Sequence, residues 1–278
     1  MRVSRCGYYR YVKGATYRES WQKAEVRARV KAFFTENSRR YGSRRIAAAL
    51  SIGRFTARVI MKREGLRAIA PKSFVPRTTD SSHGLRISEN LLKNELNKPT
   101  DKGEVFIGDI TYLPLSGGKF CYLACLQDKF TRQIVGWKVS ERMTAQLVID
   151  VFNQTRRRWR LKKGAIIHTD RGSQYASVEY RRLLYINGFR QSMSGKGNCY
   201  DNAQAESFFS RLKAELLENG VFESVGQARS EVFSYIEGYY NRVRRHSSLG
   251  YKSPNEFEKQ LAINNQTRSE ESFVQRKT

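Results

Sequence analysis

Three acidic residues lie within or next to predicted secondary-structure elements at positions where a charged side chain suggests a chemical role. Asp109 is in the middle of an apolar run, 105–113, that is typical of a buried strand, and Asp170 directly follows a second such run, 165–169. Glu206 lies in a segment with the pattern of a helix. If the two strands are neighbours in one sheet, both aspartates project at the same edge, and the helix can bring Glu206 beside them.

Three carboxylates that lie close together repel one another unless a divalent cation lies between them. Hard oxygen ligands with open coordination positions suit Mg²⁺ or Mn²⁺. Two such ions can activate an attacking oxygen and stabilise a leaving oxygen on phosphorus. The sequence therefore predicts Asp109, Asp170 and Glu206 as catalytic residues and as ligands of Mg²⁺ (or Mn²⁺), with two ions at the site.

The overall charge indicates the substrate of such a site. The chain of 278 residues has 51 Lys and Arg against 26 Asp and Glu, a net charge of +25. A mean hydropathy of −0.62 and the lack of an apolar run of about 18 residues exclude a membrane span. The positive charge either faces a polyanion or makes the surface soluble. Combined with three carboxylates, it favours phosphodiester chemistry on a nucleic acid.

The cysteines and the first residues indicate the compartment. The residues after Met1 lead into Tyr and Lys instead of an apolar segment, so we expect no signal peptide. Four cysteines without a CxxC pair are too few for a disulfide scaffold, and three histidines are too few for a Cys/His zinc module. We expect a cytoplasmic protein.

Positive charge is concentrated in the first quarter of the chain. Residues 1–72 contain 19 Lys and Arg against four Glu, a net charge of +15. The spacing of apolar residues, with glycines between the runs, predicts helices at about 20–37, 43–50 and 54–64. Because a tight turn precedes the third helix, we predict a helical helix-turn-helix domain over 1–69.

The third of these helices has two different sides. Phe55, Val59 and Ile60 give the helix an apolar side, and basic residues spaced by four lie on the other side. Such a basic stripe can be a solvated face, but the local charge and the turn favour contact with DNA. The residues predicted to bind DNA in this region are Arg44, Arg45, Arg54, Arg58 and Lys62.

The rest of the chain changes its period. We predict a linker over 70–100 and a core over 101–220, in which a three-stranded antiparallel meander is followed by alternating helices and strands. This order is typical of an α/β fold, a mixed sheet with helices on both faces. A helical C-terminal extension, 221–263, and a disordered polar tail, 264–278, complete the prediction.

Several motifs carry a resemblance to a known family. They are DITY at 109–112, IVGW at 134–137, HTDRGSQY at 168–175, ESFF at 206–209, KAE at 213–215 and YNRVRRHSSLGY at 240–251. The sequence resembles a transposase of the insertion-sequence three family, the second reading frame of that bacterial element, with an integrase-like catalytic core of the Asp-Asp-Glu type. The 35 residues between Asp170 and Glu206 are a spacing shared with retroviral integrases.

The resemblance implies a ribonuclease H-like fold, a mixed five-stranded sheet flanked by helices. It implies metal-dependent 3′-end cleavage and strand transfer of a bacterial insertion sequence, with Asp109, Asp170 and Glu206 as the acidic triad. Lys213 lies two helical turns after Glu206 on the same face. We predict that it binds a DNA phosphate, with an ordinary surface lysine as the alternative.

The resemblance also implies partners. These are the DNA of the element ends and of the target, and further copies of the chain when it is bound to DNA. The upstream-frame helix-turn-helix protein is a third partner, through fusion or association. A bacterial, nucleoid-associated location follows from the same resemblance.

Two other functions remain open at this point. A non-enzymatic DNA-binding regulator derived from a transposase would not need three clustered carboxylates, and a nuclease on the same core would cleave without joining. Single residues also have structural interpretations: Asp128 as a turn former, 201–202 as a helix cap and His168 as a strand residue. The basic cluster at 242–246 fits DNA contact and domain packing equally.

Overall fold

The computed structural model describes residues 4–14, 20–71, 84–159, 161–195, 203–217 and 220–275. The chain divides into two compact units, Met1–Ile69 and Ala70–Thr278. Among the residues described, every helix is too short or too polar to cross a membrane.

The first unit is helical. It contains α1 (Arg5–Val12), α2 (Trp21–Glu36), α3 (Ser43–Leu50) and α4 (Arg54–Arg63). Ser20 caps α2, because its hydroxyl accepts a hydrogen bond from the Lys23 amide at 3.4 Å. Helix α3 ends at Ser51, whose φ of 54° is left-handed, and α4 begins three residues later. The three helices predicted for this region are present.

Helix α4 does not bury its more apolar side. Ala57 and Met61, one helical turn apart, are buried where α4 packs against α2 and α3. This turns Phe55 and Val59 outward, so the apolar side identified from the sequence is not the buried side of the helix. The small side chain of Ala57 lets α4 approach its neighbours closely, and a helix packed in this way has a single inward stripe.

The second unit is built on a five-stranded sheet in the order β3-β2-β1-β4-β5. The strands are β1 (Val105–Pro114), β2 (Phe120–Asp128), β3 (Ile134–Ser140), β4 (Ile166–Thr169) and β5 (Arg190–Met193). The pairs β1–β2 and β2–β3 are antiparallel, and the pairs β1–β4 and β4–β5 are parallel. The predicted meander and mixed sheet are therefore confirmed.

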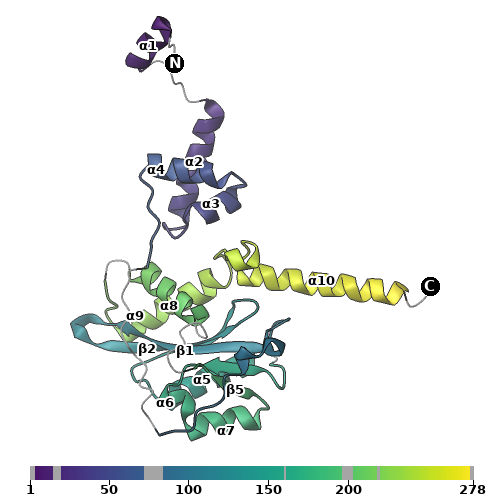
Figure 1. Ribbon diagram of the computed structural model, residues 1–278. Helices are drawn as coiled ribbons and strands as arrows, with labels where there is room; N and C mark the ends of the chain where they lie inside the picture. The colour runs from purple at the N-terminus through teal and green to yellow at the C-terminus, as the bar shows by residue number, and fades with distance from the viewer. Residues whose placement is uncertain are drawn as a thin grey trace. The chain divides into compact units, whose positions relative to one another are not determined.

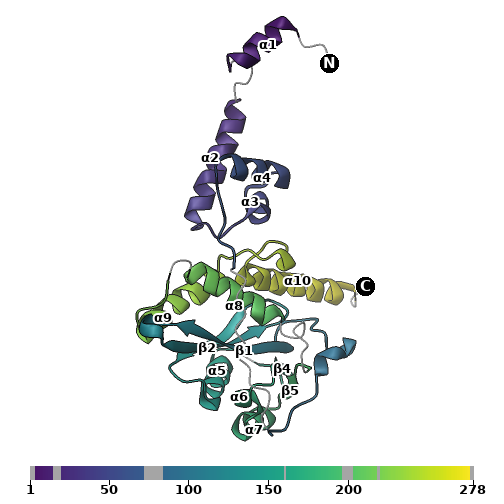
Figure 2. The ribbon, with the colours of Figure 1, turned by 60° about the vertical axis from the view of Figure 1, so that its left-hand side comes forward.

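Helices cover both faces of the sheet (Figures 1 and 2). One face is covered by α5 (Ala145–Arg158), α6 (Ser173–Ala176) and α7 (Val178–Ile186). The other face is covered by α8 (Ala203–Leu216), α9 (Val225–Phe233) and the π-helical η5 (Ser234–Tyr240). The remaining elements are η1 (Leu91–Lys93), η2 (Glu95–Asn97), η3 (Ser116–Gly118), η6 (Ser247–Leu249) and α10 (Pro254–Gln275). This arrangement confirms the predicted mixed five-stranded α/β sheet flanked by helices and accompanied by N-terminal helices.

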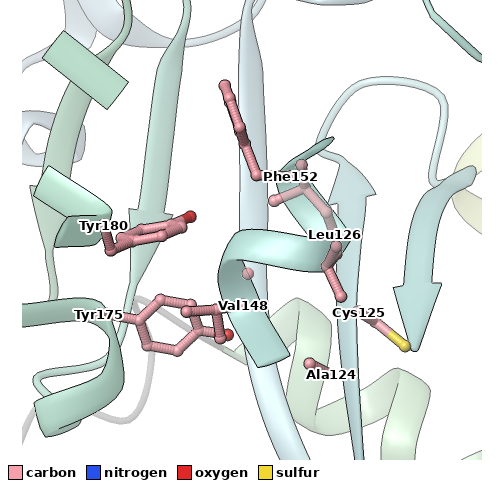
Figure 3. A pocket seen from close by; sticks show the side chains of 9 residues that line it. Ala124, Cys125, Leu126, Val148, Phe152, Tyr175 and Tyr180 are labelled. Carbon is pink, nitrogen blue, oxygen red and sulfur yellow. The ribbon is translucent and has the colours of Figure 1, made fainter. Parts of the chain in front are cut away.

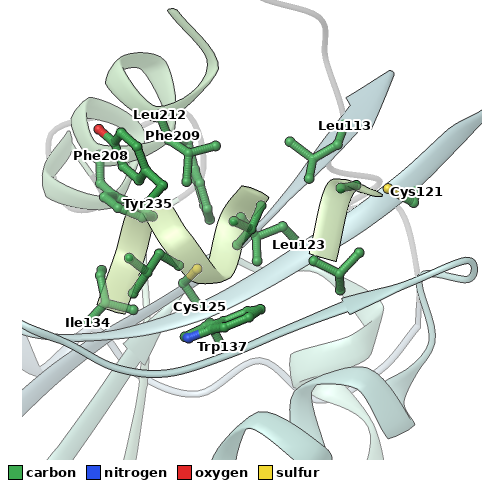
Figure 4. Packing of buried hydrophobic residues seen from close by; sticks show 14 of the residues in the cluster. Leu113, Cys121, Leu123, Cys125, Ile134, Trp137, Phe208, Phe209, Leu212 and Tyr235 are labelled. Atoms are coloured by element: carbon green, nitrogen blue, oxygen red, sulfur yellow. The ribbon is translucent and has the colours of Figure 1, made fainter. Parts of the chain in front are cut away.

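Each face of the sheet has its own hydrophobic core. On one face, Phe208 and Leu212 of α8 pack with Trp137 of β3 and with η5 (Figure 4). On the other face, α5 lies so close to β3 that a Cβ on Gly136 would overlap the Thr155 hydroxyl. This close approach explains why a strand residue in the middle of the sheet is a glycine.

Side-chain caps mark the starts of the two C-terminal helices α9 and α10. The Ser224 hydroxyl accepts from the Gln227 amide at 3.2 Å. Ser253 and Glu256 cap α10 reciprocally, at 3.3 and 2.8 Å. Helix α10 continues to Gln275, which corrects the prediction of a disordered tail for residues 264–275; residues 276–278 lie outside the described residues. No Gly or Pro interrupts the helix in that stretch.

Candidate active site

Asp109 and Asp170 lie at neighbouring positions of two parallel strands. Strands β1 and β4 pair with Ile107 beside His168, so Asp109 and Asp170, each two residues further on, are level with one another. Side chains alternate along a strand, so both aspartates face the same side as Ile107, the side on which Ala205 of α8 packs. Because neighbouring strands are only about 4.8 Å apart, the sheet brings the two carboxylates together.

Local hydrogen bonds orient each aspartate. The Asp109 carboxylate accepts from the Ile110 amide at 2.8 Å, and the Asp170 carboxylate accepts from the Gly172 amide at 3.0 Å. A Cβ on Gly172 would lie 3.1 Å from an Asp170 oxygen, so this turn has no room for a larger residue. Both side chains are half-buried, and their orientation is fixed by the backbone around them.

Helix α8 carries Glu206 and Lys213 along β1. Near the start of the helix, Ala205 packs against the first residues of β1. Two turns later, the Lys213 ammonium lies 3.7 Å from the centre of the Tyr112 ring. The helix therefore passes Asp109. Glu206 is exposed overall, but partial burial of its carboxyl raises its pKa.

The two aspartates are the pair that the structure assembles. Within the described residues, no three His, Cys, Asp or Glu side chains form a group that could hold a metal ion. Glu206 lies on the helix that covers the face of the aspartates, without joining them in such a group. Two adjacent carboxylates are hard oxygen donors, and this donor set fits a divalent cation such as Mg²⁺ or Mn²⁺.

Two buried side chains lie near the carboxylates: Cys125, the cross-strand partner of Asp109 on β2, and Tyr175 of α6. Burial raises the pKa of the Tyr175 phenol and of the Cys125 thiol well above their usual values, and the negative charge of Asp109 raises both further. Asp170 contributes to the effect on Tyr175, which places the phenol near both aspartates. At neutral pH Cys125 is a thiol and not a thiolate, so it is not a nucleophile here.

A small pocket lies beneath the site (Figure 3). It is lined by Gly108, Ala124, Cys125, Leu126, Val148, Val151, Phe152, Tyr175 and Tyr180. A Cβ on Gly108 would lie 3.1 Å from the Thr169 methyl group and 3.6 Å from the Tyr175 ring. Most of its lining residues belong to the hydrophobic core between the sheet and α5, α6 and α7, so we assign the pocket to that core.

Comparison with known proteins agrees with this geometry. Residues 99–199 and residues 187–254 each match an integrase core domain family. The chain is 40% identical over 267 residues to the transposase InsF for insertion sequence IS3A of Escherichia coli (strain K12), an alignment that covers 93% of this chain and 91% of that protein. The chain belongs to the IS3 family of transposases.

Other similar proteins include a further curated transposase. The transposase for insertion sequence element IS904 of Lactococcus lactis subsp. lactis (strain IL1403) is 42% identical over 234 residues, which are 83% of this chain and 92% of that protein. Among solved structures, the catalytic core domain of HTLV-2 integrase in complex with magnesium (trimeric form) aligns with 58% of this chain and 99% of its own, at 14% identity and a TM-score of 0.45. As a transposase, the chain is a polynucleotidyl transferase that acts in DNA recombination, integration and transposition.

Two residues of the transposase with alternative interpretations have structural roles. The Asp128 carboxylate is fully buried and accepts from the Thr131 and Gly103 amides, both at 2.7 Å, as a turn former does. His168 is fully buried in β4, with its Nδ1 atom 2.8 Å from the Ser192 hydroxyl. The predicted helix cap at 201–202 lies outside the described residues.

The basic residues divide between surface and interior. Arg44, Arg54, Arg58 and Lys62 are exposed. Arg45 is half-buried, with its guanidinium 5.6 Å from the centre of the Tyr41 ring. In the cluster at 242–246, Arg244 is buried and forms an ion pair with Glu215, so this member serves packing.

Sequence reasoning missed Tyr112. The residue closes the motif 109–112 and contacts Lys213 through its ring face. The spacing gives no signal for it, because residues three positions apart on a strand point to opposite faces, so Tyr112 is not expected on the side of Asp109. The contact could not be predicted without knowing that α8 runs beside β1.

Proposed function

We propose that Asp109, Asp170 and Glu206 bind two Mg²⁺ (or Mn²⁺) ions and that this site cleaves the 3′ ends of the insertion sequence and joins them to target DNA. The observation that supports the proposal is the pairing of β1 with β4, which places Asp109 level with Asp170 on the side that α8 covers. The family to which the chain belongs supports the same reaction.

The reaction consists of two displacements at phosphorus. Water first displaces a strand at the element end and leaves a 3′-OH; that hydroxyl then attacks a phosphodiester of the target, and the broken target strand leaves with the new 3′-OH. Bound divalent ions supply stabilisation of the attacking and leaving oxygens. The aspartates would hold the ions, and Lys213 would neutralise and orient a phosphate beside them. No bond to the protein forms in either displacement.

A strand-transfer assay with metal removal tests this proposal. Labelled duplex DNA from the element ends should be nicked and joined to a plasmid in the presence of Mg²⁺ or Mn²⁺, and addition of EDTA should abolish both products. Binding without cleavage in either metal would indicate a regulator. Cleavage without joining would indicate a nuclease, and joining that persists in EDTA would contradict the metal site.

The charge of Lys213 gives a pH-dependent prediction. Burial lowers the pKa of Lys213 to about 8, and Asp109 opposes part of that effect. Its ammonium is therefore charged at pH 7 and largely neutral at pH 9.5. The measurement is the slope of log K against log [salt] for binding to end DNA in EDTA. We expect the magnitude of this slope to fall by about 0.9 between pH 7 and pH 9.5, because one phosphate contact is lost.

The matched variant is Lys213→Arg. A guanidinium remains protonated throughout the range, so the slope of this variant should stay constant with pH. A wild-type slope that is equally constant would show that Lys213 does not contact phosphate. Lys213→Gln should give the smaller slope at every pH.

We also propose partners for the whole chain. The exposed basic residues of α3 and α4 support binding to the element ends through the first unit. Since two ends must be joined in one complex, the chain would act as a homo-oligomer on DNA and could associate or fuse with the upstream-frame helix-turn-helix protein. The net charge of +25 supports association with the bacterial nucleoid.

A further inference from the structure

Helix α4 presents two apolar side chains to solvent. Phe55 is 78% exposed and Val59 is 45% exposed, although both are the residue types that usually pack inward. They are four positions apart, so they lie on the same side of the helix, one above the other. The buried stripe of α4, Ala57 and Met61, is already in contact with α2 and α3. Among the described residues of the first unit, none covers Phe55 or Val59 enough to bury it.

The exposed side of α4 is also strongly basic. Arg54, Arg58 and Lys62 are all exposed and repeat at intervals of four, next to Phe55 and Val59 in the sequence. Helix α4 contains no acidic residue. The apolar and the cationic side chains therefore form one mixed surface along the helix, which we call the α4 surface: Arg54, Phe55, Arg58, Val59 and Lys62.

A protein partner fits this surface poorly. Phe and Arg are common in protein interfaces, but charged residues as a class are depleted at their centres. Any protein that covered Phe55 and Val59 would also bury Arg54 and Arg58 beside them. Buried cations need matched acidic partners, and leaving them without such partners is costly. A partner must therefore offer apolar groups and anionic groups in close alternation.

The major groove of B-DNA offers both kinds of group. Its floor displays the 5-methyl groups of thymine, and phosphates line its edges. The groove admits an α-helix, and the second helix of a helix-turn-helix is the one that enters it. Helix α4 follows α3 after a short turn and occupies that position in the first unit.

We propose that Phe55 and Val59 read thymine methyl groups in the major groove while Arg54, Arg58 and Lys62 hold the flanking phosphates. Along the helix axis, Phe55 and Val59 are about 6 Å apart, close to two base-pair steps. The two side chains would therefore contact methyl groups about two base pairs apart. This inference rests on the proposed binding of element ends by the first unit. It adds that thymine methyl groups are what the first unit recognises in the DNA sequence of those ends.

The test compares thymine with uracil. The full-length chain is titrated with duplexes of the two ends of its own insertion sequence, made with dT or with dU, in EDTA and against an unrelated duplex of the same length. Removal of one contacted methyl should weaken binding about fourfold, and removal of two about fifteenfold, the effect of about 0.8 kcal/mol per buried methylene-sized group. Phe55→Ala with Val59→Ala should bind the dT and dU duplexes equally.

Two control variants separate this inference from the proposed DNA binding itself. Arg58→Gln should weaken binding to both duplexes equally and reduce the salt slope by about 0.9, because it removes a phosphate contact. Tyr185→Ala removes an 83% exposed aromatic ring from α7, in the other unit, and should change neither measurement. All these side chains are exposed, so the thermal unfolding of each variant should match that of the wild type.

The outcomes that overturn the inference are distinct. If wild type prefers its ends over the unrelated duplex but binds dT and dU equally, the methyl reading is wrong and the proposed DNA binding stands. If neither Arg58→Gln nor the apolar variants change binding, or if no specific binding occurs, both proposals fail. If Phe55→Ala instead abolishes self-association measured without DNA, the α4 surface is a protein interface.

Discussion

Asp109→Asn is expected to abolish cleavage and joining of the element ends while leaving DNA binding intact. The substitution keeps the size of the side chain and replaces a charged oxygen ligand with a neutral amide. Because the pairing of β1 with β4 sets Asp109 level with Asp170, the variant removes half of the charge that the sheet brings together. We expect the rate of strand transfer to fall by more than about a thousandfold, equivalent to about 4 kcal/mol in the barrier.

The measurement is strand transfer in a single turnover, with binding to the same labelled DNA followed by anisotropy. Binding should be unchanged or tighter, since a negative charge near the phosphates is removed. Asp150→Asn is the matched control, because Asp150 lies on α5 and pairs with Lys138 at the surface. If the Asp109→Asn variant still joins ends, Asp109 is not a catalytic residue. Glu206 is the third residue of the predicted acidic triad, and the geometry does not place it in contact with the aspartates. Glu206→Gln therefore tests its role independently.

The strands and helices of this fold could be predicted from local patterns. The meander over β1–β3 follows from three apolar runs with short turns, and the helices from 3.6-residue spacing and capping residues such as Ser224. These signals depend on neighbours along the chain, and the sequence contains them directly. The order β3-β2-β1-β4-β5 does not follow from these patterns, because the crossover that a parallel neighbour needs does not determine which strand it joins.

The orientation of α4 could not be predicted in the same way. Phe55, Val59 and Ile60 make a more apolar stripe than Ala57 and Met61, so hydropathy alone selects the wrong side. Packing selects the side with a small residue where helices must approach closely. A prediction from hydropathy also takes the exposure of apolar side chains to water as unfavourable. That rule does not apply to a helix whose apolar side chains bind a ligand.

The candidate site shows a similar division. Asp109 and Asp170 were found because a charge within or at the end of a buried strand is rare unless it is used. The contacts of Lys213 with Tyr112, and the position of Tyr175 near the aspartates, depend on how α8 and α6 lie on the sheet. Such packing between distant segments leaves no periodic signal in the sequence.

The buried ion pair between Glu215 and Arg244 gives the largest expected effect on stability. Their side chains are 1% and 4% exposed, and the pair joins the end of α8 to the segment after η5 at 3.5 Å. The Tyr235 hydroxyl donates to the other Glu215 oxygen at 2.9 Å. Burial acts to lower the pKa of Arg244, but Tyr235, Glu215 and Tyr240 together raise it, so the guanidinium is charged at every accessible pH.

Glu215→Gln is expected to lower the free energy of unfolding of the second unit by about 3–5 kcal/mol. The variant leaves the Arg244 charge buried without an anionic partner, and that uncompensated charge is the source of the cost. The control Glu231→Gln affects a less buried carboxylate on α9, which accepts from Gln227, and should change stability by less than about 0.5 kcal/mol.

Urea unfolding followed by tryptophan fluorescence measures this effect. The two units can unfold separately, so the measurement uses a Trp21→Phe background, in which Trp137 and Trp159 report on the second unit alone. A cost below about 1 kcal/mol for Glu215→Gln would show that the pair contributes little.

Replacing both members of the pair separates the two origins of the effect. Glu215→Met combined with Arg244→Met removes both charges, and it should recover most of the lost stability, because two apolar side chains avoid the desolvation that the ions require. The Tyr235 hydroxyl then lacks its acceptor, at a residual cost of about 1–3 kcal/mol. If the double variant is as unstable as Glu215→Gln, then the geometry of the pair, and not its charge balance, holds α8 in place. In that case Glu206 and Lys213 depend on the extension for their position, and the double variant should lose strand transfer while it remains folded.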